Sequence, residues 1–384
     1  MKYSNPFRFR GPASEDFIVG REKEKKQLLS IIKNSQSAVL YAPRRFGKTW
    51  LLEIVARESS RQKIVPIYFD LFPVSSAVHF IELYSTAIIK SFAKTSKDAQ
   101  KFSRERFSFI NPQIVLSGDN WLITYNWEKT KNAVERILPL ILALPEEIAK
   151  KNNLKLAIIF DEFQEINRLN GEQWEREMRT VFQRHKKIAY IFSGSKTHLL
   201  INMFTDVRRP FYQSSAMISL SEISNDEWRN FISRKFKDSK ISFNDAVIDQ
   251  IIFLTGGHPY YTQLLCYFAW EVGFSKGKIV SEDVLQCFVE SLENEDAYFM
   301  QLWDELPLIQ KQLLIAIAKE GGKHLFSGDF MVANSLGPVS SIRLASMALS
   351  KQKGILDRKV KDEYKFTDPF FKLWVRREII GFEE

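Results

Sequence analysis

A glycine-lysine-threonine triplet, Gly47-Lys48-Thr49, stands between a short apolar run at residues 38–41 and a segment with helical spacing that begins near residue 50. Backbone N–H groups in such a loop converge on an anion, and the dipole of the following helix favours negative charge. The stretch 42–49 matches the phosphate-loop pattern G-x-x-x-x-G-K-[ST], with alanine in place of the first glycine. It predicts a polyphosphate site in which Lys48 reaches the β- and γ-phosphates and the Thr49 hydroxyl binds Mg²⁺.

A carboxylate pair, Asp161-Glu162, follows the apolar run 156–160. A run of this kind is typical of a parallel strand buried on both faces, and ligands bind at the carboxyl ends of such strands. Asp161 is therefore predicted to hold Mg²⁺ beside Thr49, and Glu162 to act as the general base on the attacking water. Read alone, the pair is also compatible with a solvated strand end; the upstream loop favours the metal-and-base reading.

Further candidates lie at other strand and loop ends. Ser195, after the strand predicted at 188–192, is placed next to the γ-phosphate, although a plain turn accounts for it almost as well. Val19 and Gly20 are candidates for an adenine pocket, with a tethering arm as the alternative. The residues expected to contact the nucleotide are Val19, Gly20, Ala42, Pro43, Arg44, Arg45, Phe46, Gly47, Lys48, Thr49, Trp50, Ser195 and Pro259.

The elements that must position these residues alternate between strand and helix, which predicts an α/β fold with a parallel sheet. Strands are expected at 38–41, 64–70, 156–161 and 188–192, and a hairpin at 113–127. Helices are expected at 22–33, 80–92, 130–150 and 172–187, the third broken or kinked near Pro139 and Pro145. Residues 93–112 receive no assignment.

Beyond residue 219 the pattern changes to helices. A capping box, Ser224 with Glu227, begins the first of them, and further helices are expected at 244–254, after His258-Pro259 and at 281–306. We interpret this segment as a helical lid over the nucleotide. The expected domains are a P-loop ATPase domain at 1–218, the lid at 219–300 and a third domain at 301–384.

The third domain is predicted to be a winged helix, from helices at 307–319, 327–334 and after 338, followed by strands at 355–358 and 363–366. Such a fold binds DNA through its third helix and wing, or docks on protein; acidic residues in the wing leave both open. The candidate DNA contacts are Ser340, Ser341, Arg343, Ser346, Arg358, Lys359, Lys361 and Lys365.

Composition narrows the class of partner. A formal net charge of +9 and a pI near 9.2 favour a polyanion: nucleotide, nucleic acid or an anionic surface. Cys266 and Cys287 lie in helix-like apolar patterns without metal-ligand spacing, as expected for core residues in a reducing compartment. The N-terminus lacks an apolar targeting segment and the apolar runs are too short to span a bilayer, so we expect a cytoplasmic protein without a membrane span.

Taken in order, these motifs resemble the archaeal-type ATPase family within the STAND class of P-loop NTPases, relatives of AAA+ proteins. The resemblance rests on Val-Gly-Arg-Glu at 19–22, Pro-Arg-Arg-Phe-Gly-Lys-Thr at 43–49, Ile-Phe-Asp-Glu-Phe-Gln at 159–164, Ser-Gly-Ser at 193–195, Gly-Gly-His-Pro at 256–259 and Phe-Thr-Asp-Pro at 366–369. It implies a switch driven by ATP or ADP with Mg²⁺, in which the glycine-x-proline turn ending at Pro259 places the lid against the nucleotide. Oligomerisation is compatible with the class.

The chain departs from the family at Tyr212, which is followed by Gln213 and Ser214 instead of Gly-Arg. An arginine finger is therefore assigned only by substitution, to Arg208 or Arg209, and two solvated arginines are the alternative reading.

The leading hypothesis is a Mg²⁺-dependent ATPase that acts as a regulatory switch, with low turnover. Two alternatives stay open: a nucleotide-gated signalling protein that hardly hydrolyses ATP, and a DNA-binding protein that uses the winged helix. A GTPase is disfavoured because the chain has no Asn-Lys-x-Asp motif, and a small-molecule kinase because of the Asp-Glu strand end and the long C-terminal half.

Overall fold

The computed structural model describes residues 4–12, 14–93, 95–107, 112–117, 120–125, 133–360 and 363–381. The chain divides into two compact units, which we describe separately. Unit 1 comprises Met1–Gly20, Pro43–Gly47 and Ser221–Glu384, and unit 2 comprises Arg21–Ala42 and Lys48–Leu220.

Unit 2 is built on a five-stranded parallel sheet with the order β2-β5-β6-β1-β7. The strands are β1 (Ala38–Tyr41), β2 (Ile64–Asp70), β5 (Lys155–Asp161), β6 (Ile188–Gly194) and β7 (Ala216–Ser219). The parallel α/β prediction is confirmed, whereas β7 was not predicted. Because all five strands run the same way, the residues that follow β1, β5 and β6 meet at one edge of the sheet.

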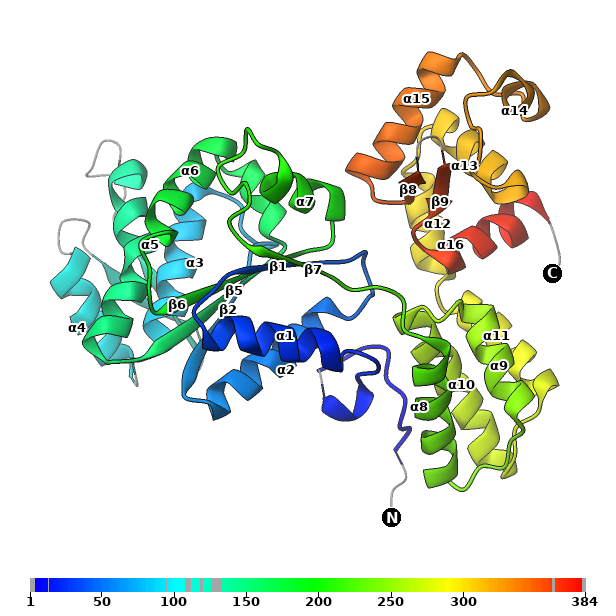
Figure 1. The fold of residues 1–384 in the computed structure, drawn as a ribbon, viewed down its shortest axis with the longest axis horizontal. Helices are drawn as coiled ribbons and strands as arrows, with labels where there is room; N and C mark the ends of the chain where they lie inside the picture. Colours follow the sequence, from blue (N-terminus) through cyan, green and yellow to red (C-terminus); the bar gives the residue numbers. More distant parts are fainter. Residues whose placement is uncertain are drawn as a thin grey trace. The chain divides into compact units, whose positions relative to one another are not determined.

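Helices cover both faces of this sheet (Figure 1). One face carries α1 (Glu22–Lys33) and α2 (Lys48–Arg61), and the other carries α3 (Ala77–Lys90), α5 (Ala133–Lys151), α6 (Gly171–Phe182) and α7 (Thr197–Thr205). The hairpin prediction is confirmed by β3 (Gln113–Ser117) and β4 (Asn120–Thr124). The unassigned stretch contains α4 (Ser96–Phe107).

Two helices of unit 2 differ from the prediction in extent. Helix α5 continues through Pro139 and Pro145, so the expected break is absent, while a kink there stays a prediction. Burial of Ile137 and Ile141 against the core compensates there for the backbone hydrogen bonds that proline cannot donate. Helix α6 ends at Phe182 rather than at 187, and a polar turn then leads into β6.

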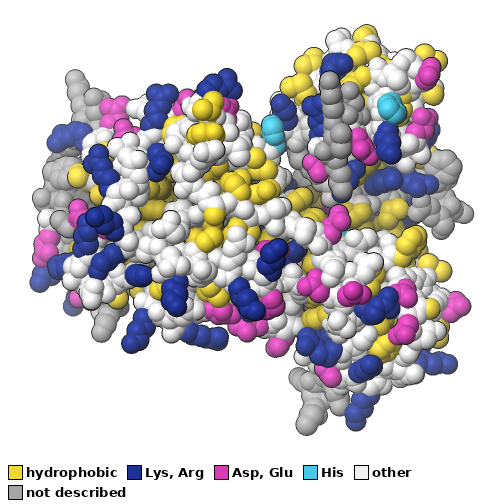
Figure 2. Space-filling view, viewed as in Figure 1, with side chains coloured by type: hydrophobic (Ala, Val, Ile, Leu, Met, Phe, Trp, Pro, Cys, Tyr) yellow, Lys and Arg dark blue, Asp and Glu magenta, His cyan; other side chains and the backbone are white. Residues whose placement is uncertain are grey.

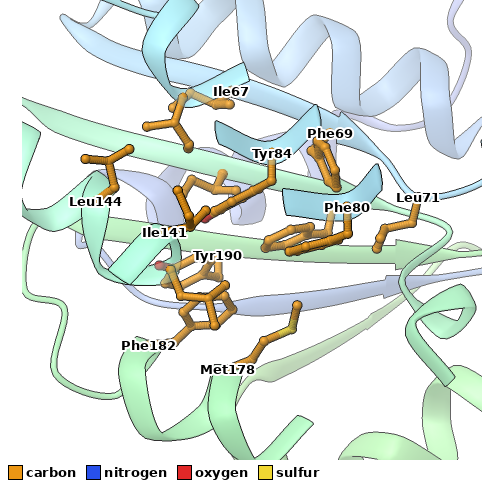
Figure 3. Packing of buried hydrophobic residues seen from close by; sticks show 14 of the residues in the cluster. Ile67, Phe69, Leu71, Phe80, Tyr84, Ile141, Leu144, Met178, Phe182 and Tyr190 are labelled. Atoms are coloured by element: carbon orange, nitrogen blue, oxygen red, sulfur yellow. The ribbon is translucent and has the colours of Figure 1, made fainter. Parts of the chain in front are cut away.

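The core of unit 2 is rich in aromatic rings (Figure 3). Phe80 and Tyr84 of α3 stack with ring centroids 5.4 Å apart, and Phe182 stacks on Tyr190 of β6 at 4.0 Å. Stacked and edge-to-face rings bury a large apolar area in a defined geometry. This packing fixes the helices that cover one face of the sheet.

Unit 1 begins with the short helix η1 (Glu15–Phe17) and then contains α8 (Asn225–Asp238), α9 (Asp245–Thr255), α10 (Pro259–Lys276), α11 (Ser281–Glu293) and α12 (Asp296–Asp304). The capping box of Ser224 and Glu227 at the start of α8 is confirmed. The single helix expected at 281–306 is instead two, with the chain turning at Asn294 and Glu295. Glu295 there is buried and serves as a hydrogen-bond acceptor, which a continuous surface helix would not allow.

The C-terminal part of unit 1 is a winged helix, as predicted. It contains α13 (Leu308–Glu320), α14 (Gly328–Ala333), α15 (Val339–Met347), the antiparallel pair β8 (Leu356–Val360) and β9 (Glu363–Phe366), and α16 (Pro369–Trp374). Among the described residues, no helix combines the length and the apolar character needed to cross a bilayer.

Candidate phosphate-binding site

The loop after β1 has the backbone conformation of an anion-binding turn. Arg45 and Gly47 adopt positive φ angles of 66° and 84°. Arg44, which precedes them, and Phe46, which lies between them, do not. Alternation of right- and left-handed residues directs successive N–H groups toward one point. Nothing lies within 4 Å of the position that a Cβ at Gly47 would take, so glycine is required there by conformation and not by space.

Lys48 is the first residue of α2 and is buried. Its Nζ donates a hydrogen bond to the carbonyl oxygen of Ala42, 2.8 Å away, so the ammonium group lies back along the loop. Thr49 and Arg44 are exposed, and Trp50 is half-buried. The cationic end of Lys48 and the hydroxyl of Thr49 are thus both held at the helix N-terminus, where anions are favoured.

Asp161, at the carboxyl end of β5, has both oxygens engaged. Its Oδ1 accepts a hydrogen bond from the Glu162 N–H at 3.0 Å, and its Oδ2 lies 3.4 Å from the Thr49 hydroxyl that donates to it. The Tyr68 hydroxyl on neighbouring β2 donates to the same Oδ2. Burial and the charge of Asp161 raise the pKa of Tyr68 far above its usual range, so the phenol stays a donor.

The donor set suits Mg²⁺. The ion prefers hard oxygen ligands and binds proteins through one or two carboxylates or hydroxyls, with water and phosphate oxygens completing its shell. Thr49 and Asp161 offer such oxygens in hydrogen-bond contact with each other. The described residues contain no cluster of three His, Cys, Asp or Glu side chains able to bind a metal on their own, so any Mg²⁺ here would depend on its nucleotide.

Glu162 is held by three donors that converge on its Oε2: the Ser195 N–H at 3.1 Å, the Ser195 hydroxyl at 2.9 Å and the Gln164 amide at 2.5 Å. Its backbone is left-handed, with φ of 50°. Gly194 allows this arrangement, because a Cβ there would lie 2.0 Å from the Gln164 side-chain oxygen.

Two functional side chains of this edge carried no role in the sequence-based prediction, Tyr68 and Gln164. Tyr68 is placed by the pairing of β2 with β5, which sets Asp70 opposite Asp161. Strand order cannot be read from local sequence, so this neighbour was not foreseen. Gln164 lies two residues beyond Glu162, and its spacing along the chain was the available signal.

Arg45 of the loop lies in unit 1, enclosed by acidic and aromatic side chains. Its Nη1 is 2.7 Å from the Tyr261 hydroxyl, 2.7 Å from Glu295 Oε2 and 3.9 Å from Asp368 Oδ2. The guanidinium also lies over the ring of Tyr260, 4.4 Å from its centroid. Burial alone would lower the pKa of Arg45, but the charges of Tyr261, Glu295 and Asp368 outweigh it and raise the pKa.

Tyr261 in turn donates to Asp368 Oδ2 at 2.5 Å. Asp368 caps α16 by accepting the Phe371 N–H. The arginine cage, which we define as Tyr260, Tyr261, Glu295, Tyr298 and Asp368, therefore ties the phosphate loop to α10, to α12 and to the end of the winged helix.

The other unit 1 candidates lie beside helices α8 and α10. Val19 packs in the hydrophobic core that residues of α8 to α11 form, and Gly20, with φ of 61°, has the Glu227 side chain 2.7 Å from the position of a Cβ. Pro259 is the first residue of α10, after the N-cap His258, whose ring meets Phe46 edge-on at 4.9 Å.

The N-terminal segment is tethered to α10. Asn5 donates to the Tyr267 carbonyl oxygen at 3.0 Å, and Gln263 donates to the Phe17 carbonyl oxygen at 2.8 Å. The tethering arm and the adenine pocket both stay predictions.

The arginine-finger candidates are both engaged within unit 2. Arg209 pairs with the buried Glu175 and lies 3.6 Å from Glu172. Burial raises the pKa of Glu175 to about 7, although Arg209 opposes the shift. Arg208 forms an ion pair with Asp206 at 2.8 Å.

Among the described winged-helix candidates for DNA contact, Ser340, Arg343 and Arg358 are exposed, and some candidates also contact other side chains of unit 1. The Arg343 guanidinium stacks over the Phe326 ring at 4.5 Å, Ser346 is buried, and Lys365 lies 3.6 Å from Glu222. The outer face of α15 exposes Leu344 and Met347. The Lys359 side chain and all of Lys361 lie outside the described part of the structure.

Comparison with known proteins agrees with this geometry. Residues 18–265 match the family described as an ATPase domain predominantly from Archaea, and residues 297–377 match a probable winged helix domain. No curated protein matches the chain.

Solved structures share the fold at low sequence identity. The Walker-type ATPase PABY2304 of Pyrococcus abyssi is 18% identical with a TM-score of 0.68, over 96% of this chain and 99% of that one. The Aeropyrum pernix ORC2 protein, solved as ADPNP-ADP complexes, is 13% identical with a TM-score of 0.58, over 93% of each chain. The family match covers well over half of the sequence, and the chain therefore belongs to the family of ATPase domains found predominantly in Archaea.

Proposed function

We propose that this protein binds ATP with Mg²⁺ and hydrolyses it slowly, as a regulatory switch of the STAND and AAA+ kind. The observation that carries the proposal is the meeting of four groups at one edge of the unit 2 sheet: Lys48, Thr49, Asp161 and Glu162. ATP hydrolysis needs a helix N-terminus and a cation at the phosphates, oxygen ligands for the metal and a carboxylate held in place near the water. Lys48 is the cation, Thr49 and Asp161 are the oxygen ligands, and Glu162 is the carboxylate.

Each residue has a distinct task in this proposal. Lys48 exchanges its bond to the Ala42 carbonyl for the β- and γ-phosphates, and the loop N–H groups hold the same oxygens. Thr49 and Asp161 hold Mg²⁺, which neutralises charge on the phosphate oxygens when it is bound. Glu162 orients a water through Oε1 while Ser195 and Gln164 hold Oε2 in place.

The regulatory part of the proposal rests on Arg45. Its guanidinium is bound to Tyr261 and Glu295, so the loop that would hold the phosphates is anchored to the C-terminal half of the chain. A change in loop conformation on nucleotide binding has to move or break these contacts. The arginine cage thereby gives the two nucleotide states different contacts, as a switch requires.

A non-hydrolysing switch is the second candidate, favoured by the engagement of Arg208 and Arg209 within unit 2. It predicts tight nucleotide binding with negligible phosphate release. The third candidate, DNA binding by the winged helix, has less support, because Leu344 and Met347 are exposed on α15 and Arg343 is stacked on Phe326. This surface suits a protein partner better than base edges.

Nucleotide binding is tested by titrating the protein with a fluorescent ATP analogue, with and without Mg²⁺. Lys48→Ala should weaken binding at least about 100-fold, since charge-assisted contacts to phosphate are lost. The matched control, Lys63→Ala, removes an exposed lysine from the other edge of the same sheet and should bind like the wild type. Equal binding by all three proteins would contradict the proposed phosphate site.

A further inference from the structure

Eight Lys and Arg residues lie where strands β2, β5 and β6 begin, at the edge of the unit 2 sheet opposite the phosphate loop. They come from the end of α1, the turn before β2, the end of α5 with the turn before β5, and the turn before β6. We call them the basic edge: Lys33, Lys63, Lys150, Lys151, Lys155, Arg184, Lys186 and Lys187. Lys187 is half-buried and the others are exposed.

Hydrogen bonds hold these segments together. Lys155 Nζ donates to the Lys33 carbonyl oxygen at 2.8 Å, and Lys187 Nζ donates to Asn153 Oδ1 at 2.8 Å. Strand pairing sets Lys155 opposite Ile64, the residue after Lys63. The basic edge is therefore one continuous surface of a rigid sheet, although its residues are far apart in the sequence.

The charge of this surface is only partly balanced by nearby carboxylates. Segments 33–37, 62–63, 150–155 and 183–187, all described by the structure, contain no Asp or Glu. Of the two acidic residues next to them on α5, Glu146 is buried, accepts the Lys187 N–H at 3.0 Å and lies 3.4 Å from Lys150 Nζ. Glu147 is exposed. Eight cations beside these two carboxylates leave an excess of positive charge, and its potential attracts a polyanion.

The side chains between the cations identify the kind of polyanion. Apart from the half-buried Leu154 and His185, they are amides and hydroxyls: Asn34, Ser35, Gln36, Ser37, Gln62, Asn152, Asn153 and Gln183. Such groups, together with Lys and Arg, make most protein contacts to nucleic-acid phosphates and sugars. A membrane surface would call for exposed aliphatic or aromatic side chains beside the cations, and these four segments expose no large hydrophobic residue.

We propose that the basic edge binds the sugar-phosphate backbone of a nucleic-acid duplex. Three neighbouring strands about 4.8 Å apart, extended by their lysine side chains, form a surface roughly 20 Å wide. A duplex carries one charge per about 1.7 Å of its axis, so this width faces several phosphates at once. Recognition through the backbone alone predicts binding without sequence preference.

The basic edge is separate from the phosphate site. Strand β5 has seven residues, and at about 3.3 Å per residue its two ends lie roughly 20 Å apart. A duplex on one edge therefore leaves the loop at the other edge open. Figure 2 shows many Lys and Arg side chains over the part of the molecule that contains the sheet and its helices in Figure 1.

The test measures binding of a short fluorescent DNA duplex to the full chain by anisotropy, without nucleotide and over a range of salt concentrations. The combined variant Lys63→Gln, Lys151→Gln and Lys186→Gln removes three cations of the basic edge. Affinity should fall about tenfold or more, and the slope of log affinity against log salt should shrink by about 2.7, at 0.9 per lost contact. The matched control, Lys237→Gln, Lys240→Gln and Lys278→Gln, makes the same change in net charge at exposed positions of unit 1 and should bind like the wild type.

Circular dichroism checks that both triple variants are folded. Wild-type affinity in the basic-edge variant would overturn the proposal, as would the absence of any salt-dependent duplex binding. Loss of binding only in Arg343→Ala with Arg358→Ala would assign the duplex to the winged helix instead. Binding to anionic vesicles without binding to the duplex would assign the surface to membranes. Because no nucleotide is present, the outcome is independent of whether the protein hydrolyses ATP.

Discussion

Arg45 Nη1 in the phosphate loop lies 2.7 Å from Oε2 of Glu295, a carboxylate whose side chain is fully buried. The two residues are 250 positions apart in the sequence, and the contact joins a nucleotide-binding loop to the turn between α11 and α12. A buried charge pair is strongly destabilised when one partner is lost, so a loop movement that separates them requires new contacts for both. The pair is therefore suited to make the loop conformation depend on the C-terminal half of the chain.

Glu295→Gln should speed the release of a fluorescent ADP analogue. The substitution keeps the shape of the side chain but removes its charge, so Arg45 loses one charge-assisted contact and the loop opens more readily. Loss of about 1.4 kcal/mol corresponds to a roughly tenfold faster release in stopped flow. Glu293→Gln, at an exposed position of the same turn region, serves as the control. Release at the wild-type rate in Glu295→Gln would show that the arginine cage does not control nucleotide release.

Tyr68→Phe should lower the Mg²⁺ concentration needed for half-maximal ATP hydrolysis by several-fold. The Tyr68 hydroxyl bonds to the same Asp161 oxygen that faces Thr49, and it therefore competes with the metal. Removing the hydroxyl leaves that oxygen available. Tyr212→Phe is the comparison, because Tyr212 is partly exposed on a loop beyond α7. A higher Mg²⁺ requirement would instead make Tyr68 a residue that positions Asp161 for the metal.

Ser195→Ala should lower kcat by about three- to tenfold without changing KM. The hydroxyl is one of the three donors on Glu162 Oε2, and a hydrogen bond of this kind contributes about 1 kcal/mol. The Ser195 N–H still holds the carboxylate, which limits the loss. Ser214→Ala removes a hydroxyl that donates to the Phe211 carbonyl oxygen, and it should leave kcat unchanged. A change in KM with constant kcat would place Ser195 in nucleotide binding.

His258 makes the stability of the protein sensitive to acid. Burial, reinforced by the nearby charge of Arg45, lowers the pKa of His258 from 6.5 to about 3. The unfolded chain takes up a proton below its ordinary pKa while the folded chain does not, so stability falls as the pH drops from about 6.5 toward 3.

Urea unfolding at several pH values gives the slope of the free energy of unfolding against pH. Between about pH 6 and pH 4, this slope should be smaller in His258→Gln than in the wild type by about 1.4 kcal/mol per pH unit. His324→Gln, at an exposed position, should keep the wild-type slope. Identical slopes for the wild type and His258→Gln would show that His258 is protonated in the folded protein.

Local sequence patterns predicted most of the sheet and the two phosphate-site motifs. The apolar run before Asp161 and the glycine-lysine pair at Gly47 each carry their structure within a few residues, because burial and φ preference are local properties. The order of the strands, the edge strand β7 and the helix α7 depend on packing between distant segments, and they were not predicted.

The arginine cage could not be predicted from local sequence either. Arg45 was predicted to touch phosphate, but its contacts with Tyr261 and Glu295 follow from the placement of three separate helices. The break at Glu295 was missed for a related reason: the spacing on both sides is helical, and only the burial of that carboxylate identifies the turn.

The central claim is that Glu162 activates water for ATP hydrolysis. Its most direct test is the rate of phosphate release from ATP and Mg²⁺ by the wild type and by Glu162→Gln, with nucleotide affinity measured on the same samples. We expect sustained phosphate release by the wild type, and a release rate at least about 100-fold lower in Glu162→Gln at unchanged nucleotide affinity. Equal release rates in the two proteins, or no turnover in the wild type, would contradict it.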